Sequence, residues 1–237
     1  MSGPLLLVSA TAEEARPLRE ALDGASLPAR WGHAWEGRLG DVDVVLTHLG
    51  VGKANTAAGL ALALERWRPE AVVQYGIGGA FVGSFLSSGM VAVASTDVHV
   101  DTGAGEADAW EDMESVGFPL LEGPPPRFNE MPTDRRLSER LAAPSAAPLL
   151  RFATSERVTG SLEEADRLQR RFDVAIESME GAAAAQVCLA LGVPFAEIRA
   201  VSNVVGERDR RTWDVPRAIR AVQGALGAAL PDLAASR

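Results

Sequence analysis

Short apolar runs alternate along the chain with longer segments in which apolar residues recur at the period of an α-helix. Runs of about five residues are typical of strands, and segments of ten or more with this period are typical of helices. Their repeated alternation predicts an α/β fold built on a largely parallel sheet. The predicted strands cover 5–9, 42–49, 71–75, 90–100, 152–155, 174–178 and 195–200, and the predicted helices cover 13–23, 54–66, 161–171, 179–191 and 213–230.

Two stretches argue against a closed eight-fold barrel. The runs 34–39 and 42–49 are separated only by Gly40-Asp41, which predicts a β-hairpin. The stretch 71–100 holds two strand runs with no segment of helix length between them. We therefore expect a mixed sheet, partly antiparallel, with helices on both faces, in the form of a three-layer sandwich.

The 237 residues show no internal repeat and no change of composition regime, so we expect one domain over 1–237. The predicted helices 54–64 and 179–191 are apolar almost all round, which places them at the centre of the molecule or under a subunit contact. The segment 101–132 is acidic at first and then rich in proline. It is longer than an ordinary connection, which predicts a functional or mobile loop.

Composition and charge exclude several classes of protein. Apolar residues make up 47% of the chain and charged residues 23%, as in globular proteins rather than disordered ones. The formal net charge of −9 disfavours nucleic acid or a membrane as a partner, and no apolar run is long enough to span a bilayer. Cys188 is the one cysteine, and the N-terminus is unlike a signal peptide, so we expect a cytoplasmic protein.

Three familiar motifs are incomplete in this chain. Gly50-Val51-Gly52-Lys53 is followed by Ala54, whereas a phosphate-binding loop has a hydroxyl residue there. The segment Gly76-Ile77-Gly78-Gly79-Ala80-Phe81 has phenylalanine where a dinucleotide-binding segment has its last glycine. His99 and Asp101 lack a third metal ligand. We therefore expect no cofactor and no metal site.

Five segments of the chain, two of them the incomplete glycine motifs just described, occur in a recognisable order. They are Ala10-Thr11-Ala12-Glu13-Glu14, Gly50-Val51-Gly52-Lys53, the glycine-rich 76–81, Glu177-Ser178-Met179-Glu180-Gly181-Ala182-Ala183 and Ile198-Arg199-Ala200-Val201-Ser202-Asn203. In this order and spacing they resemble the nucleoside phosphorylase and nucleosidase superfamily, specifically its hydrolase branch, which includes methylthioadenosine/S-adenosylhomocysteine nucleosidase. The segment 202–209, with Trp213, is most similar to the futalosine hydrolases of menaquinone biosynthesis.

The resemblance implies an N-glycosidase that acts on a small purine nucleoside, and it assigns roles to residues. It implies that Glu14 positions and deprotonates the attacking water, that Glu180 accepts hydrogen bonds from ribose hydroxyls, and that Asn203 faces the purine. Carboxylates suit this chemistry because the bond breaks through a cationic ribosyl state. The implied substrate-binding residues are Gly78, Gly79, Val158, Thr159, Ser178, Met179 and Ser202, with Met179 on the sugar, Ser202 orienting Asn203 and the backbone of 158–159 along the base edge.

The resemblance also implies a homo-oligomer, since members of the superfamily are usually dimers or hexamers that complete the site from a neighbour. A dimer is favoured. The acyl end of futalosine carries a carboxylate, and its candidate partners are Arg127, Arg208, Arg210 and Arg211.

Several of these residues also have a purely structural interpretation. Thr11 and Glu14 have the spacing of a helix capping box, which by itself explains Glu14. Glu180 stands where a carboxylate interacts favourably with a helix N-terminus, although its burial costs free energy unless it is hydrogen-bonded. Asn203 fits an ordinary turn after a strand, and the glycines of 76–79 fit a tight turn with positive φ. Both interpretations stay open at the level of the sequence.

Charge separates two possible nucleophiles. Phosphate is a dianion that binds among arginines and hydroxyls, whereas the corresponding positions here are Gln74 and Ile77, and Glu14 faces the same space. Water is therefore the expected nucleophile. A purine nucleoside phosphorylase and a non-catalytic nucleoside-binding protein are the alternatives, and the latter needs no residue with the role of Glu14.

Asn203 stands where adenine-specific nucleosidases of the superfamily carry Asp. An amide oxygen accepts a hydrogen bond from protonated N7 of a purine, and the amide NH₂ donates to O6. We therefore expect a 6-oxopurine, with hypoxanthine and dehypoxanthine futalosine released from futalosine. Aminofutalosine and methylthioadenosine/S-adenosylhomocysteine are the alternative substrates.

Overall fold

The structure is a computed structural model that describes residues 3–106 and 109–234. Strands and helices alternate over most of the chain, as the sequence pattern predicts. The strands are β1 (Leu5–Ser9), β2 (Asp23–Leu27), β3 (His33–Leu39), β4 (Val42–His48), β5 (Ala71–Ala80), β6 (Val91–His99), β7 (Gly103–Ala104), β8 (Glu111–Asp112), β9 (Glu130–Pro132), β10 (Leu149–Thr154), β11 (Ile176–Ser178) and β12 (Phe195–Val204). The helices are α1 (Ala12–Ala21), α2 (Lys53–Trp67), α3 (Met113–Val116), α4 (Arg135–Ala142), α5 (Leu162–Phe172), α6 (Gly181–Leu191) and α7 (Val215–Ala234), with 3₁₀ turns η1 (Val82–Ser84), η3 (Ala143–Ser145) and η4 (Arg210–Thr212).

One ten-stranded mixed sheet runs through the molecule in the order β11-β10-β6-β12-β5-β1-β4-β3-β2, with β9 beside β6. Strands β4, β1, β5 and β12 form a parallel row, whereas β3 and β4 form the antiparallel hairpin that Gly40-Asp41 predicts. Strand β11 pairs with both β10 and β5, so this end of the sheet curls. The predicted mixed sheet is confirmed, and the curl brings Glu177 of β11 opposite Gly79 of β5.

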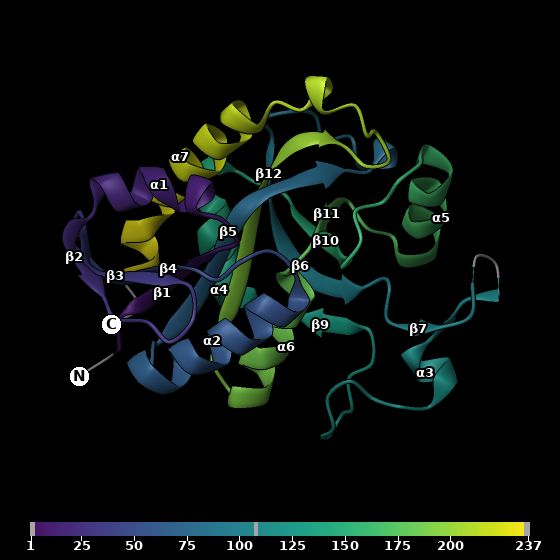
Figure 1. Cartoon of the computed structure of the whole chain (residues 1–237), viewed down its shortest axis with the longest axis horizontal. Coiled ribbons are helices and arrows are strands. Elements are labelled where there is room, and N and C mark those ends of the chain that lie inside the picture. The colour runs from purple at the N-terminus through teal and green to yellow at the C-terminus, as the bar shows by residue number, and fades with distance from the viewer. Residues whose placement is uncertain (1–2, 107–108, 235–237) are drawn as a thin grey trace.

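Helices cover both faces of the sheet, as expected (Figure 1). Helices α2 and α6 lie side by side on one face, and α1, α4 and α7 pack on the other. Side chains of a strand alternate between faces, so Leu5 and Leu7 of β1 enter one core while Leu6 and Val8 enter the other. Both faces of β1 are therefore apolar, which explains its uninterrupted apolar run.

Helix α6 is apolar on all sides, but its last three residues are exposed. Gly181 and the four alanines after it are buried, and α6 packs against α2 and the sheet, as expected for a central helix. Leu189 and Leu191 near its end are 36% and 56% exposed, so the expectation of little exposure is wrong for the last turn. Across residues 3–106 and 109–234, no helix has the length and hydropathy needed to cross a membrane.

The glycine-rich segment 76–79 is part of strand β5 rather than a turn. None of its glycines has a positive φ. A side chain is excluded by close approach, because a Cβ on Gly76 would lie 2.5 Å from Glu14 Oε1 and 2.6 Å from Arg199 Nη1. The interpretation as a positive-φ turn is therefore wrong, and the glycine serves to admit two charged side chains.

Strand β2 and helix α4 were not expected from the pattern. The residues of β2 are almost all exposed and include no apolar run, so pairing with β3 alone makes them a strand. In α4, Leu137 and Leu141 enter the core between charged side chains. The helix starts where Asp134 Oδ1 accepts a hydrogen bond from the N–H of Leu137 at 2.8 Å.

The long segment 101–132 contains the short elements β7, β8, α3 and β9, and its residues 107–108 lie outside the description. Hydrogen bonds of the Asn129 side chain hold the described part of this segment together. Its Nδ2 donates to the backbone oxygens of His99 and Thr102, both at 2.7 Å, and its Oδ1 accepts from the N–H of Met113 at 2.8 Å. One buried amide thus ties three parts of this region together.

Candidate functional site

A cavity of about 600 Å³ opens where β1, β5, β11 and β12 end and where α1 and α7 begin. Ligands of α/β proteins bind at this carboxyl edge, because the connections diverge there and leave a crevice. All but one of the expected site residues line the cavity. They are Glu14, Gly78, Gly79, Val158, Ser178, Met179, Glu180, Ser202 and Asn203.

Glu14 contributes one carboxylate to this cavity. Its Oε2 accepts from the backbone N–H of Thr11 at 3.0 Å and from the Thr11 hydroxyl at 2.9 Å, while Thr11 Oγ1 accepts from the N–H of Glu14 at 3.2 Å. The predicted capping box is therefore confirmed. Its other oxygen, Oε1, accepts from the N–H of Ile77 in β5 at 3.1 Å. One carboxylate thus caps α1 and also forms part of the cavity wall.

Glu180 contributes the second carboxylate and is 3% exposed. Oε1 accepts from the N–H of Gly52 at 3.1 Å, and Oε2 accepts from Nη2 of Arg199 at 3.1 Å. Its side chain does not cap α6, so the helix N-terminus does not account for its position. Burial raises the pKa of Glu180, the Arg199 guanidinium opposes this, and the Glu14 carboxylate adds to it. Each oxygen keeps a lone pair for a ligand.

Arg199 of β12 joins the Glu180 carboxylate to the sheet and is 1% exposed. Besides Glu180, its guanidinium donates through Nη1 to the backbone oxygen of Ile77 at 3.1 Å and through Nε to Glu197 Oε1 at 2.5 Å. Every guanidinium nitrogen therefore has a partner within the protein. This arginine positions Glu180 rather than offering a free clamp for phosphate.

Another pair of carboxyl groups lies behind Arg199, outside the cavity lining. Asp97 of β6 and Glu197 of β12 are fully buried, and a Cβ on Gly181 would overlap an oxygen of each. Burial and the neighbouring Glu197 carboxylate raise the pKa of Asp97 well above its usual range. Of the two carboxyl groups, Glu197 is the one that pairs with Arg199, through Nε at 2.5 Å.

Ser202 and Asn203 lie near the end of β12. The Ser202 hydroxyl is 2.7 Å from Asn203 Oδ1 and 3.1 Å from the backbone oxygen of Gly78, and Asn203 Nδ2 donates to the backbone oxygen of Val204 at 3.0 Å. Asn203 keeps one amide hydrogen and one oxygen lone pair for a ligand. A donor and an acceptor side by side match the O6 and N7–H edge of a 6-oxopurine.

Thr159 is the expected site residue that lies outside this cavity. Its backbone N–H donates to Glu177 Oε2 at 3.2 Å, and its hydroxyl donates to Glu177 Oε1. Burial raises the pKa of Glu177, and these hydrogen bonds oppose the rise. The role of the 158–159 backbone along the base edge stays a prediction: Val158 lines the cavity, and the N–H and hydroxyl of Thr159 are bound to Glu177, which also lines it.

Several cavity residues had no assigned role at the level of the sequence. Glu177 and Arg199 are charged residues within predicted strands, and a charge at a position that a strand buries is the signal that identifies them. Arg208 and Arg210 were named only as candidate partners of a carboxylate. Together with Trp213 they line the cavity, whereas Arg127 and Arg211 do not.

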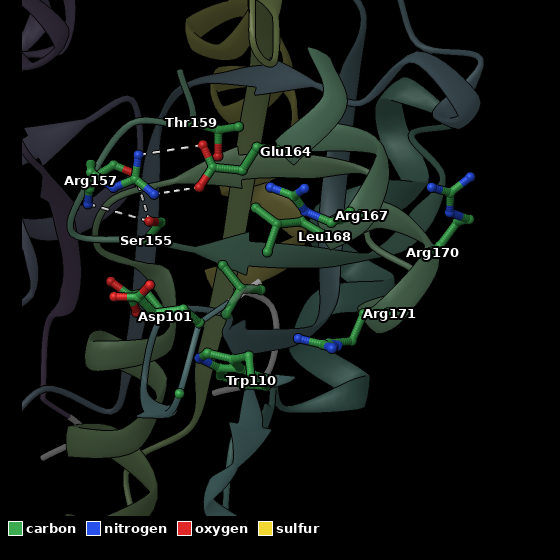
Figure 2. Close-up of a pocket in the computed structure, with 13 residues that line it drawn as sticks. Asp101, Trp110, Ser155, Arg157, Thr159, Glu164, Arg167, Leu168, Arg170 and Arg171 are labelled. Carbon is green, nitrogen blue, oxygen red and sulfur yellow. Dashed lines mark hydrogen bonds and ion pairs between the residues drawn. The ribbon is translucent and has the colours of Figure 1, made fainter. Parts of the chain in front are cut away.

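A second cavity, of about 760 Å³, lies beside α5 and shares none of these lining residues (Figure 2). Its four arginines are all engaged by neighbours. Arg157 pairs with Glu164, Arg167 with Glu163 and Arg170 with Asp166, and Cζ of Arg171 lies 5.1 Å from the centre of the Trp110 ring. The cavity that holds Glu14 and Glu180 is therefore the candidate active site.

His99, which precedes the second-cavity residues Val100 and Asp101, makes the stability of the fold sensitive to acid. Its Nε2 donates to Gln186 Oε1 at 3.0 Å. Burial first, and then the Lys53 ammonium, lower its pKa from 6.5 to about 4. As the pH falls, His99 is therefore protonated at a higher pH in the unfolded chain than in the folded one. The contribution of His99 to the free energy of unfolding is complete above pH 6.5 and is lost as the pH falls through 4.

We expect the wild type to lose up to about 3 kcal/mol of unfolding free energy through His99 between pH 6.5 and 4. His99→Gln keeps a donor toward Gln186 but removes the titration. Urea unfolding of both proteins from pH 7.5 to 4 measures the difference, which should shrink as the pH falls. Parallel stability curves would contradict the assignment.

Comparison with known proteins agrees with this geometry. The family model of the phosphorylase superfamily matches residues 4–233. The chain is 37% identical over 194 residues to a futalosine hydrolase of Thermus thermophilus, covering 81% of this chain and 83% of the relative. It is 35% identical over 234 residues to a futalosine hydrolase of Acidothermus cellulolyticus, covering 97% and 92%.

A solved structure agrees as well. The 5′-methylthioadenosine/S-adenosylhomocysteine nucleosidase of Colwellia psychrerythraea, in complex with adenine, has a TM-score of 0.85 at 24% identity and covers 98% of this chain and 96% of its own. At this identity the likeness shows the fold. The chain belongs to the phosphorylase superfamily, and within it the chain is similar to futalosine hydrolases.

Proposed function

We propose that this protein is a nucleoside hydrolase that cleaves futalosine to hypoxanthine and dehypoxanthine futalosine, a step of menaquinone biosynthesis. The observation that carries the proposal is the convergence of Glu14, Glu180 and Asn203 on one cavity. Two carboxylates and an amide supply what the reaction needs: a base for water, a counter-charge for the sugar and a partner for the purine. The similarity to futalosine hydrolases over most of the chain supports the same assignment.

In this mechanism the bond between ribose C1′ and purine N9 breaks, and its electron pair leaves with the base. Glu180 accepts hydrogen bonds from the ribose hydroxyls, and these strengthen as the sugar becomes cationic. Water adds its oxygen to C1′ and gives its proton to Glu14. The base takes up a proton at N7 from solvent, and Asn203 Oδ1 accepts the hydrogen bond from that N–H while Nδ2 donates to O6.

Water fits the surroundings of Glu14 better than phosphate does. A phosphate dianion beside the Glu14 carboxylate would be repelled, and the nearest guanidinium, that of Arg199, is already bound to Glu180 and Glu197. We therefore expect base release from futalosine at the same rate with and without phosphate. If base release required phosphate and the sugar product carried a phosphate on C1′, the protein would be a phosphorylase instead.

The assay that tests the function offers futalosine, inosine, aminofutalosine and methylthioadenosine to the protein in phosphate-free buffer and identifies the released base. Hypoxanthine from futalosine is the expected result. Preferred release of adenine from aminofutalosine or methylthioadenosine would favour the adenine-type nucleosidases. No release from any of the four would favour a nucleoside-binding protein.

A substitution at Asn203 tests which residue selects the purine base. In Asn203→Asp the carboxylate repels purine O6 and accepts from a 6-amino group, so preference should move from 6-oxo to 6-amino purines. The ratio of kcat/KM for futalosine over aminofutalosine should fall by about tenfold or more, the effect of exchanging one buried hydrogen bond for a clash. Steady-state kinetics of both proteins on both nucleosides measure it.

Asn203→Leu is the matched control, since it keeps the side-chain volume and removes both hydrogen-bonding atoms. We expect this variant to lose activity on both nucleosides without reversing their order. An unchanged ratio in a folded, active Asn203→Asp protein would mean that Asn203 does not read the base.

The arrangement of the whole chain is part of the proposal. One nucleosidase domain over 1–237, with the sheet as the middle of three layers, accommodates the site at its carboxyl edge. We also propose a homo-oligomer, with a dimer favoured. Val82 and Phe85, which follow β5, are 73% and 94% exposed and are apolar surface of the kind that a second copy would cover.

A further inference from the structure

The segment after β12 places two arginines around one indole ring at the active-site cavity. Cζ of Arg208 lies 5.5 Å from the centre of the Trp213 ring, and Cζ of Arg210 lies 5.7 Å from it. All three residues line the same cavity as Glu14 and Asn203. A cation over an aromatic face is attracted by the ring quadrupole, so the ring holds both guanidinium groups near the cavity.

The turn that carries them is tied to the base-reading end of β12. Trp213 Nε1 donates to the backbone oxygen of Glu207 at 3.2 Å, and the N–H of Asp214 donates to the backbone oxygen of Ser202 at 2.9 Å. The two arginines are therefore placed by the same backbone that places Asn203. Their position relative to a bound purine is a property of the fold.

Within the described part of the chain, no carboxylate pairs with Arg208 or Arg210, and the ring of Trp213 is the neighbour that both guanidinium groups share. The intervening carboxylate, Asp209, is taken by Arg211, whose Nε lies 2.9 Å from Oδ1 and whose Nη2 lies 2.6 Å from Oδ2. In the second cavity three of the four arginines pair with carboxylates, and Arg171 lies over the Trp110 ring. Arg208 and Arg210 thus bring two guanidinium groups without a carboxylate partner to the active-site cavity.

Arginine recognises a carboxylate through two parallel N–H···O bonds, and an indole face stacks with flat groups. The remaining cavity wall near Trp213 is apolar and includes Val215, Pro216 and Ile219. A ligand that satisfies this surface has an apolar or aromatic stem and a terminal carboxylate.

We propose that Arg208 and Arg210, with Trp213 beside them, bind the carboxylate of an acyl or aryl arm carried on the ribose side of the nucleoside. The inference rests on the proposed function, because it assumes that a nucleoside occupies the cavity with its base at Asn203. Under this proposal the segment 208–213 makes the protein prefer nucleosides that carry such an arm over nucleosides that lack it. The cation pair would also suit a free phosphate, and the experiment distinguishes the two anions.

The test is a thermodynamic cycle that combines substitutions in the protein with removal of the negative charge from the ligand. Binding of futalosine and of its methyl ester, which lacks the negative charge, is measured by calorimetry for wild type, Arg208→Ala, Arg210→Ala and the double variant, all carrying Glu14→Gln so that the ligand is not hydrolysed during the titration. We expect wild type to bind the acid about 10- to 100-fold more tightly than the ester, as charge-assisted hydrogen bonds do. The double variant should bind acid and ester within about threefold of each other.

Kinetics supply an independent readout. The double variant should raise KM for futalosine and leave kcat/KM for inosine, which has no arm, within about threefold of wild type. Arg167→Ala is the matched control: it removes an arginine of the second cavity whose ion pair is exposed, so we expect no change in the preference for the acid.

Four results would overturn the proposal: equal binding of acid and ester by wild type, an acid preference that survives in the double variant, an acid preference lost in Arg167→Ala, or equal losses on futalosine and inosine. Inosine cleavage that depends on inorganic phosphate in wild type and loses this dependence in the double variant would assign the arginines to phosphate. Calorimetry needs no turnover. A protein that binds the acid through these arginines but releases no hypoxanthine would refute the proposed function alone.

Discussion

Glu180→Gln is expected to slow hypoxanthine release by at least about a hundredfold while the chain still folds. The amide keeps the shape of the side chain and loses the charge that opposes the ribosyl cation. It also places an NH₂ where the Gly52 N–H or Arg199 Nη2 now donates, so the unfolding free energy should fall by about 1–3 kcal/mol. The measurements are kcat and urea unfolding, at a temperature where both proteins are folded.

Glu197→Gln is the control for this experiment. It takes a carboxylate from the same guanidinium but lies outside the cavity lining. We expect a similar loss of stability, with kcat reduced by less than about tenfold. Equal losses of kcat in the two variants would mean that Glu180 only holds Arg199, and a near-wild-type rate in Glu180→Gln would remove the ribose-site assignment.

Glu14→Gln should lower kcat by ~10²–10⁴-fold and leave nucleoside binding close to wild type, because an amide cannot take a proton from water. Glutamine still forms the capping box with Thr11, but its NH₂ then faces the N–H of Ile77, so the unfolding free energy should fall by about 1–3 kcal/mol. Glu14→Ala should lose the same activity and, because the cap is lost as well, up to about 2 kcal/mol more. Comparing the two variants separates catalysis from capping.

The control for the loss of a cap is Asp134→Ala, at the start of α4 and outside the cavity lining. It should cost about 1 kcal/mol of stability and leave the rate unchanged. Full activity in Glu14→Gln would leave capping as the whole role of Glu14, and the water would need another base.

Local patterns predicted much of the architecture. Strand β1 occupies the expected residues 5–9, because both of its faces are buried and its run is uninterrupted. The capping box at Thr11 and Glu14 is a contact between near neighbours, and short-range spacing is enough to predict it. Strand β2 and helix α4 escaped prediction because cross-strand pairing makes the first, and a narrow apolar stripe marks the second.

The candidate site was predictable as a set of residues and less so as a set of contacts. Motif order pointed to Glu14, Glu180 and Asn203, and all three line the cavity. The position of Thr159 outside the cavity lining could not be predicted, because it depends on hydrogen bonds to Glu177 of β11, which lies 18 residues further along the chain. The glycines of 76–79 were misread because the charged groups that exclude a side chain at Gly76 come from distant parts of the chain.

The sequence by itself determined the alternation of strands and helices, the hairpin at Gly40-Asp41, the start of α1 and the types of residue available for chemistry. These depend on periodicity and on neighbours in the chain. Tertiary structure alone decided that Arg199 joins Glu180 to Glu197 and that Arg208 and Arg210 share Trp213 at the same cavity. The physical reason is that contacts between distant residues follow from the register of β5 against β12 and from the path of the segment after β12, which no local spacing encodes.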